Sequence, residues 1–145
     1  MISIISNIQD IKDIFKDYVD NFVEEFDISL IYVFGSYAKG NSRKDSDIDI
    51  AILLNGDIDV YTKLNILGAL IDIFKREDID LVILNNVNEV LKFQVIKYGK
   101  IIYMESLYTK AMLESRVMSE YMDKEYFRDT QRKYSHKRFL EIMKS

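Results

Sequence analysis

Two apolar segments on either side of a short polar loop constrain the fold of this chain more than any other feature. The first ends in Ile31–Phe34 and the second occupies residues 48–54. Both are rich in the β-branched and aromatic residues that favour buried strands. Ten residues separate Ser36, just after the first segment, from Asp47, just before the second. The pattern predicts a strand, a loop and a second strand.

Two acidic residues, Asp47 and Asp49, open the second of these strands. Residues two apart on a strand project from the same face, so the two carboxylates would lie side by side while Ile48 faces the opposite layer. Adjacent carboxylates repel each other unless a cation lies between them. Mg²⁺ prefers oxygen ligands and often binds one or two carboxylates together with substrate phosphates. The pair therefore predicts a site for two Mg²⁺ ions; the simpler alternative is a solvated pair of acids at the mouth of the strand.

Gly35 and Ser36 are suited to binding the phosphates of a nucleotide. Glycine lets a phosphate approach the backbone closely. A serine at the start of a helical turn adds a hydroxyl beside backbone N–H groups that lack partners within the helix, and such groups favour an anion. Residues 33–54 therefore offer donors for a triphosphate and carboxylates for its metal ions.

Three basic residues lie in the loop between the strands, namely Lys39, Arg43 and Lys44. A guanidinium suits bidentate contact with a phosphate, so Arg43 is the first candidate for a contact with the triphosphate. The alternative for all three residues is a solvated loop charge.

The order of the segments predicts an α/β (α+β) fold, a mixed sheet packed mainly on one side by helices. The expected strands are residues 29–34, 47–54, 78–84 and 100–104, and the expected helices are 2–26, 36–39, 58–76, 87–98 and 107–127. Residues 1–127 would form one domain. Residues 128–145 would extend the last helix as a basic C-terminal tail, which is either solvated or docks a partner.

The spacing of apolar residues also predicts which faces of the helices are buried. In helix 58–76 the first expected face comprises Tyr61, Leu64, Leu67, Ile71 and Phe74, and a second comprises Ile66, Leu70 and Ile73. In helix 107–127 the residues expected to be buried are Leu107, Ala111, Met118, Tyr121 and Met122.

Composition narrows the possible classes of protein. The chain has 145 residues, no cysteine and one histidine, so we expect one domain without disulfides, thiolate metal sites or His-rich metal sites. A net charge of −4 argues against direct nucleic-acid binding through bulk charge. The N-terminus lacks a basic leader, and no apolar run reaches the length of a membrane span. We therefore expect a cytoplasmic protein that does not associate with membranes.

The motif Gly35-Ser36, ten residues, Asp47-x-Asp49 resembles the signature of the DNA polymerase β-type nucleotidyltransferase superfamily. The short chain and the spacing resemble its minimal nucleotidyltransferase (MNT) branch. More closely, the chain is similar to the MNT-domain antitoxins of HEPN/MNT toxin–antitoxin pairs. The resemblance covers most of residues 1–125, and its specificity is concentrated in residues 33–54. It implies the polymerase β-like minimal nucleotidyltransferase fold.

The resemblance also implies a third acid on the next core strand. Asp80 is the best match, Asp78 is a weaker candidate one pleat earlier, and a structural turn acid is the alternative. By this resemblance, Asp47 and Asp49 would bridge two Mg²⁺ ions. Asp80 would bind the ion that activates the incoming hydroxyl. Gly35, Ser36 and Arg43 would contact the nucleotide.

The implied activity is transfer of AMP from ATP to a tyrosine of a cognate HEPN ribonuclease toxin, which silences the toxin in a hetero-oligomeric complex. HEPN nucleases carry Arg and His with four to six residues between them. Here His136 has three residues between it and Arg132 and seven between it and Arg128, so the chain matches the transferase and not the toxin.

Two other functional classes remain open. The chain could transfer a nucleotide to a small molecule such as an aminoglycoside, although such enzymes usually carry an additional helical domain for the acceptor. It could also be an antitoxin that neutralises its partner by binding alone, which the intact set of three acids argues against.

Overall fold

A four-stranded mixed sheet forms the centre of the protein. The computed structural model describes residues 5–42 and 46–144. Its strands are β1 (Ile28–Phe34), β2 (Ile48–Leu54), β3 (Ile79–Ile83) and β4 (Lys100–Met104), and their order across the sheet is β3-β2-β1-β4. β1 is antiparallel to β2 and β4, whereas β2 and β3 are parallel. The predicted mixed sheet is thus confirmed.

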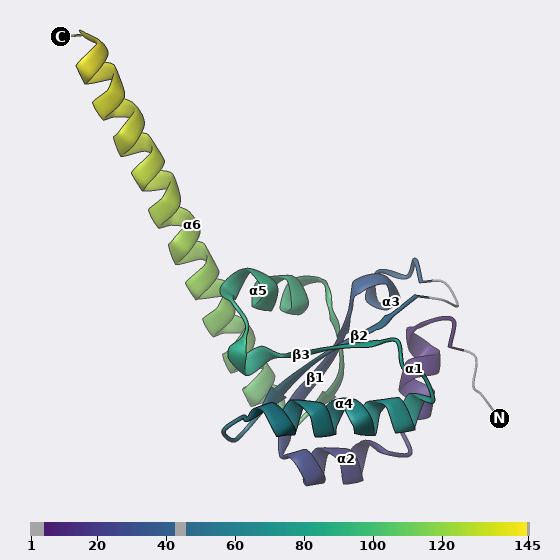
Figure 1. Cartoon of the computed structure of the whole chain (residues 1–145). Coiled ribbons are helices and arrows are strands. Elements are labelled where there is room, and N and C mark those ends of the chain that lie inside the picture. Colours follow the sequence, from purple (N-terminus) through teal and green to yellow (C-terminus); the bar gives the residue numbers. More distant parts are fainter. Residues whose placement is uncertain (1–4, 43–45, 145) are drawn as a thin grey trace.

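Helices cover both faces of the sheet (Figure 1). On one face lie α1 (Ile8–Phe15), α2 (Val19–Phe26) and α4 (Val60–Phe74), and on the other lie α5 (Glu89–Tyr98) and the first part of α6 (Leu107–Lys144). Two short helical segments, α3 (Gly35–Lys39) and η1 (Leu84–Asn86), follow β1 and β3. The expectation of helices mainly on one side was wrong. Both sets of alternating side chains in β1 are apolar, so each face of that strand requires a cover.

The N-terminal helix expected over residues 2–26 is instead two helices, α1 and α2, joined by a turn in which the Tyr18 N–H donates to the Phe15 carbonyl at 2.9 Å. The rings of Phe15 and Phe22 meet edge to face with centroids 5.6 Å apart, and Phe15 stacks on Phe74 at 6.1 Å. The turn lets both N-terminal aromatic rings pack into the core beneath α4. Apolar residues continue at steps of three or four across it, so periodicity did not indicate the break.

The expected buried faces of two helices were wrong in part. In α4 the buried side chains are Ile66, Leu70, Ile73 and Phe74, whereas Tyr61 and Leu64 are 75% and 58% exposed. In α6 the buried residue is Val117, while Leu107, Ala111, Met118 and Met122 are exposed and Tyr121 is half-buried.

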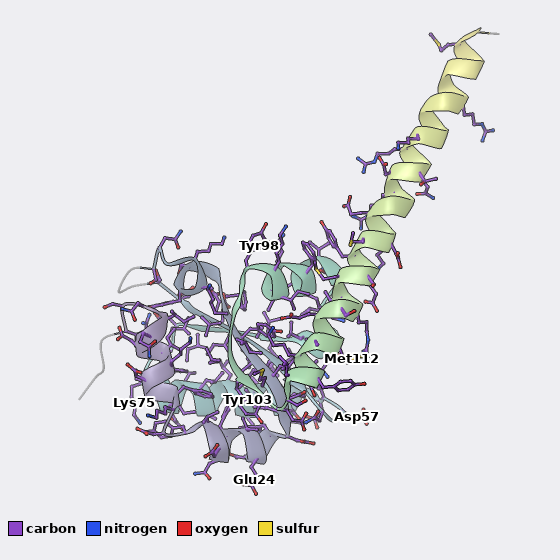
Figure 2. All side chains as sticks on the ribbon, turned by 180° about the vertical axis from the view of Figure 1, so that it is seen from behind. Glu24, Asp57, Lys75, Tyr98, Tyr103 and Met112 are labelled. Carbon is purple, nitrogen blue, oxygen red and sulfur yellow. The ribbon has the colours of Figure 1, made fainter. Side chains whose placement is uncertain are left out.

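The last helix, α6, continues without interruption from Leu107 to Lys144. Its C-terminal half extends away from the body of the protein in two opposite views (Figures 1 and 2), and Met112 near its start is already 45% exposed. A division of the chain at residue 127 therefore stays a prediction. Within the described residues, no helix combines the length and the apolar character that crossing a membrane requires.

We predict that two leucines of α4 differ sharply in their contribution to stability. Leu70 is fully buried, so Leu70→Ala should lower the free energy of unfolding by about 2–5 kcal/mol. Leu64 is largely exposed, so Leu64→Ala should change it by about 0.5 kcal/mol or less. Denaturant unfolding of both variants measures the difference, and equal losses would contradict the observed orientation of α4.

Candidate active site

Gly35 and Asp49 lie against each other where β1 ends and β2 begins. The register of the two strands pairs Phe34 with Asp49, so Gly35 follows directly beside the acid. Gly35 has a φ of +69°, and a Cβ at this position would overlap the Asp49 carboxylate. Both the left-handed backbone and the close approach require glycine here. The backbone at the start of α3 is therefore held next to one of the predicted acids.

The three predicted acids come together at the starts of β2 and β3. The parallel register pairs Asp49 with Asp80. Asp47 lies just before β2 and is exposed, as is Asp80, whereas Asp49 is half-buried. Strand pairing thus brings together Asp49 and Asp80, which lie 31 positions apart in the sequence.

The electrostatics of Asp49 reflect this arrangement. Burial raises its pKa first, and the charges of Asp80 and Asp47 raise it further, from 3.8 to about 6. A hydrogen bond with Asp80 also contributes to the rise in the pKa of Asp49. Within the described part of the chain, no three acidic, histidine or cysteine side chains already converge as metal ligands. The three acids are therefore close neighbours whose carboxylates are not arranged as one ligand set.

Ser36 lies in the first turn of α3, and its side chain is half-buried. Its carbonyl accepts the N–H of Gly40, which ends the helix with a φ of +80°, and that of Asn41 at 3.2 Å. The chain after β1 therefore turns back on itself within a few residues, as expected for a short loop. Among the basic residues of the loop, Lys39 is exposed at the end of α3. Arg43 and Lys44 lie outside the described residues.

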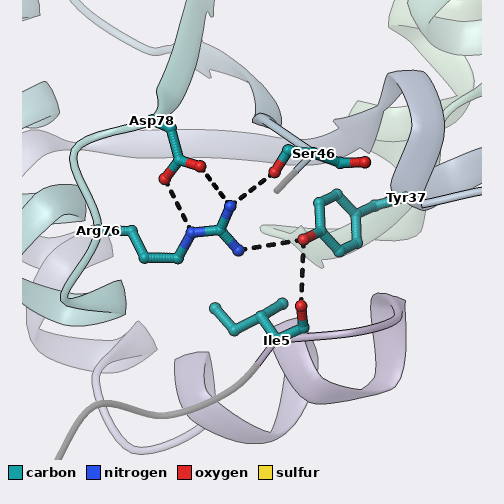
Figure 3. A network of polar contacts seen from close by, with 5 residues as sticks. All are labelled: Ile5, Tyr37, Ser46, Arg76 and Asp78. Atoms are coloured by element: carbon teal, nitrogen blue, oxygen red, sulfur yellow. Dashed lines mark hydrogen bonds and ion pairs between the residues drawn. The ribbon is translucent and has the colours of Figure 1, made fainter. Parts of the chain in front are cut away.

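Asp78, the weaker candidate for the third acid, is occupied by another interaction. Its carboxylate accepts two hydrogen bonds from Arg76, one of them from Nε at 2.8 Å (Figure 3). This hydrogen bonding lowers the pKa of Asp78. Arg76 was not singled out from the sequence, because a basic residue in the turn between a helix and a strand carries no recognisable pattern. Asp80 has no cationic partner of this kind among the described residues, so it is a better candidate than Asp78 for the third acid.

Comparison with known proteins connects this geometry to a family. A family model described as Polymerase beta, Nucleotidyltransferase matches residues 9–107. Over 73 residues the chain is 38% identical to the protein adenylyltransferase MntA of Shewanella oneidensis, a match that covers 50% of this chain and 52% of the relative. The chain spans about half the length of the curated relatives it matches.

Solved structures match over a larger part of the chain. A toxin–antitoxin crystal structure with AMP-PNP aligns with a TM-score of 0.68 at 26% identity, covering 79% of this chain and 93% of that one. A complex of the tri-AMPylated Shewanella oneidensis HEPN toxin with MNT antitoxin aligns with a TM-score of 0.64 at 24% identity, covering 82% and 93%. This second match shows the fold alone.

The matched residues include all four strands, Gly35, Ser36 and the three acids. The resemblance predicted from the motif is therefore confirmed, and the chain belongs to the polymerase β nucleotidyltransferase family.

Proposed function

We propose that this protein is a Mg²⁺-dependent adenylyltransferase that acts as an antitoxin by transferring AMP from ATP to a tyrosine of a cognate HEPN ribonuclease toxin. The observation that carries the proposal is the juxtaposition of Asp47, Asp49 and Asp80 beside Gly35 in a member of this family. The acceptor class is supported by the similarity to protein adenylyltransferases and to a toxin–antitoxin structure with AMP-PNP.

The residues present fit a pair of Mg²⁺ ions. The donors are carboxylate oxygens, and no ion pair among the described residues compensates their charge. Asp47 and Asp49 would hold both ions, and Asp80 would hold one of them. When bound, two such ions stabilise the attacking and leaving oxygens of an in-line displacement.

The chain's own residues would position the substrates and accept a proton. The Gly35 backbone and the Ser36 hydroxyl would orient the triphosphate, and Arg43 would add a bidentate contact. The tyrosine oxygen attacks the α-phosphorus, the bond to the β-phosphate breaks, and pyrophosphate leaves. The tyrosine proton passes to Asp80. Positioning and charge neutralisation are the main requirements of such a transfer.

The end of α6 is the part of the chain that we propose docks the toxin. Residues 128–145 form the tail, and its basic side chains Arg128, Arg132, Lys133 and Arg138 are exposed. Arg128 and Lys133 form only exposed ion pairs within the helix, at 3.8 and 3.2 Å. Such pairs contribute little to stability, so these cations remain available to steer an acidic partner.

We predict that the two acids of β2 are essential for transfer. The protein incubated with Mg²⁺ and ATP labelled at the α-phosphate should label the HEPN protein encoded next to it. Asp47→Asn and Asp49→Asn should each abolish labelling without loss of the fold. Asp57→Asn, in the exposed turn after β2, is the matched control and should label normally. Near-normal turnover by either variant would exclude the metal role, and binding without labelling by the unaltered protein would indicate an antitoxin that acts sterically.

We predict that Ser36→Ala weakens nucleotide binding. Its effect should be smaller than the loss of turnover caused by replacing Asp47 or Asp49. A hydrogen bond to a charged phosphate contributes about 1.5–3 kcal/mol, so the Kd for a non-hydrolysable ATP analogue should rise by roughly 10- to 150-fold. Calorimetric titration in Mg²⁺ measures it. Ser119→Ala, exposed on α6, should bind normally. An unchanged Kd for Ser36→Ala would remove this serine from the phosphate site.

We predict that the stability of the metal-free protein depends on pH through Asp49. Its pKa is about 6 in the folded protein against 3.8 ordinarily, so the folded state binds more protons between these values. The free energy of unfolding should therefore fall as pH rises from about 4 to 6. Asp49→Asn removes this loss of stability. The free energy of unfolding of the variant should therefore exceed that of the unaltered protein at pH 7, and the difference should be absent at about pH 4. Denaturant unfolding with a chelator tests this, and the same difference at both pH values would refute it.

A further inference from the structure

Arg76 lies in the connection between α4 and β3, and its side chain is only 12% exposed. Besides the two hydrogen bonds to Asp78, its Nη2 donates to the Ser46 carbonyl at 2.6 Å and its Nη1 donates to the Tyr37 hydroxyl at 3.1 Å (Figure 3). One guanidinium therefore joins three segments, namely the start of β3 next to Asp78, two residues away, and the residues around Ser46 and Tyr37, which lie 30 and 39 positions away. A guanidinium presents its donors in a rigid planar fork, which lysine lacks.

Each of these three segments carries a residue of the candidate active site. Ser46 directly precedes Asp47, and Tyr37 directly follows Ser36. The third segment reaches Asp80, in β3, two residues after Asp78, which directly precedes that strand.

Backbone pairing reinforces the link between the second and third segments. The Asp78 carbonyl accepts the N–H of Ile48 at 3.0 Å, so the backbone of this residue joins the start of β2 while its carboxylate holds Arg76. A displacement of Arg76 would therefore be transmitted to the starts of both strands that carry the acids.

Tyr37 extends the network to the N-terminal segment. Its ring is buried in the core, and its hydroxyl donates to the Ile5 carbonyl at 3.2 Å (Figure 3). A second hydrogen bond runs from the Ser42 hydroxyl to the Ser6 carbonyl at 2.8 Å. Ile5 and Ser6, just before α1, thus accept hydrogen bonds from Tyr37 and Ser42, which lie in the segment that follows β1.

This arrangement differs from an ordinary surface ion pair. The pair Lys124–Glu89 joins α6 to α5 with side chains that are 52% and 36% exposed, and such pairs contribute little. Arg76 is mostly buried and binds a carboxylate, a backbone carbonyl and a hydroxyl at once. Its hydrogen bonds therefore fix the distances between the segments, whereas an exposed ion pair only places two opposite charges near each other.

We propose that Arg76 is a positioning residue. It holds Gly35 and Ser36, which would bind phosphate, at a fixed distance from the three acids, and its hydrogen bonds to Asp78 and Tyr37 keep it in place. This inference rests on the proposed transfer reaction. Arg76 does not contact substrate. It acts through Ser46, Tyr37 and Asp78, whose neighbours in the chain would bind the nucleotide and its ions.

The test compares Arg76→Met and Arg76→Lys with Leu70→Ala, a core variant of the preceding helix that leaves the network untouched. Small displacements of reacting groups can cost about 100-fold in rate, so Arg76→Met should lower kcat for labelling by roughly 10- to 100-fold. KM for ATP should rise much less, because misalignment is felt mainly in the transition state. Arg76→Lys should recover part of kcat through its contact with Asp78. Leu70→Ala, assayed well below its melting temperature, should keep kcat within about threefold of the unaltered protein, since the site geometry is unchanged.

A readout independent of catalysis separates this inference from the proposed function. In the metal-free protein, amide hydrogen exchange should rise in Arg76→Met at residues 35–42 and 46–50 relative to the rest of the core, whereas Leu70→Ala, which lowers global stability, should raise exchange across the core without this preference. Tyr37→Phe, which keeps the buried ring, should give a smaller rise confined to residues 35–42. Failure of the unaltered protein to label any acceptor would refute the proposed function, whereas the exchange data would still decide the positioning role. Unchanged exchange in Arg76→Met, or a rise spread evenly over the core as in Leu70→Ala, would overturn it.

Discussion

The close approach of Asp47, Asp49 and Asp80 is the constraint on which the rest of this structure depends. Like charges side by side oppose folding, and after burial, the larger cause, the charges of Asp80 and Asp47 raise the pKa of Asp49 further. The acids stay together because the pairing of β2 with β3 fixes Asp49 opposite Asp80. Apolar burial on both sides of β2, where Ile48, Ile50, Ala51 and Ile52 are fully buried, supplies the favourable free energy that offsets this repulsion. The core therefore maintains an electrostatic arrangement that would not form in isolation.

Coverage of both faces of the sheet also explains where the site lies. The faces of β1 and β2 are occupied by α1, α2 and α4 on one side and by α5 and α6 on the other, so the candidate site lies at the ends of these strands. At one such end the acids open β2 and β3, and Gly35 closes β1 directly beside Asp49. A side chain at Gly35 would occupy the position of that carboxylate, so the loop and the acid fit together only with glycine.

The strands and the acid pair Asp47 and Asp49 could be predicted from the sequence because they depend on local patterns, whereas Asp80 was expected from the family resemblance. A continuous apolar run marks a buried strand, and Asp47-x-Asp49 places both acids on one face by strand alternation alone. The sequence left two candidate buried faces for α4, because apolar residues surround that helix and nothing local distinguishes Leu64, which is exposed, from Leu70, which is buried. The turn between α1 and α2 was missed for a related reason, since the Phe15 ring stacks on Phe74, a partner about 60 residues away in the chain. Arg76 is the extreme case, because two of its three partners, Tyr37 and Ser46, lie 39 and 30 positions away.

Asp78 and Asp80 show how a single cation can assign different roles to two acids that lie only two residues apart. Asp78 directly precedes β3, and Asp80 is the second residue of that strand. Arg76 binds Asp78, so the charge of that carboxylate is compensated within the protein and its pKa is lowered. In the described part of the chain, no ion pair compensates Asp47, Asp49 or Asp80. Negative charge without a cationic partner therefore remains where these acids face each other across β2 and β3, so a divalent cation would gain by binding there. The same guanidinium that removes Asp78 from competition for the cation also holds the segments on which the remaining acids lie.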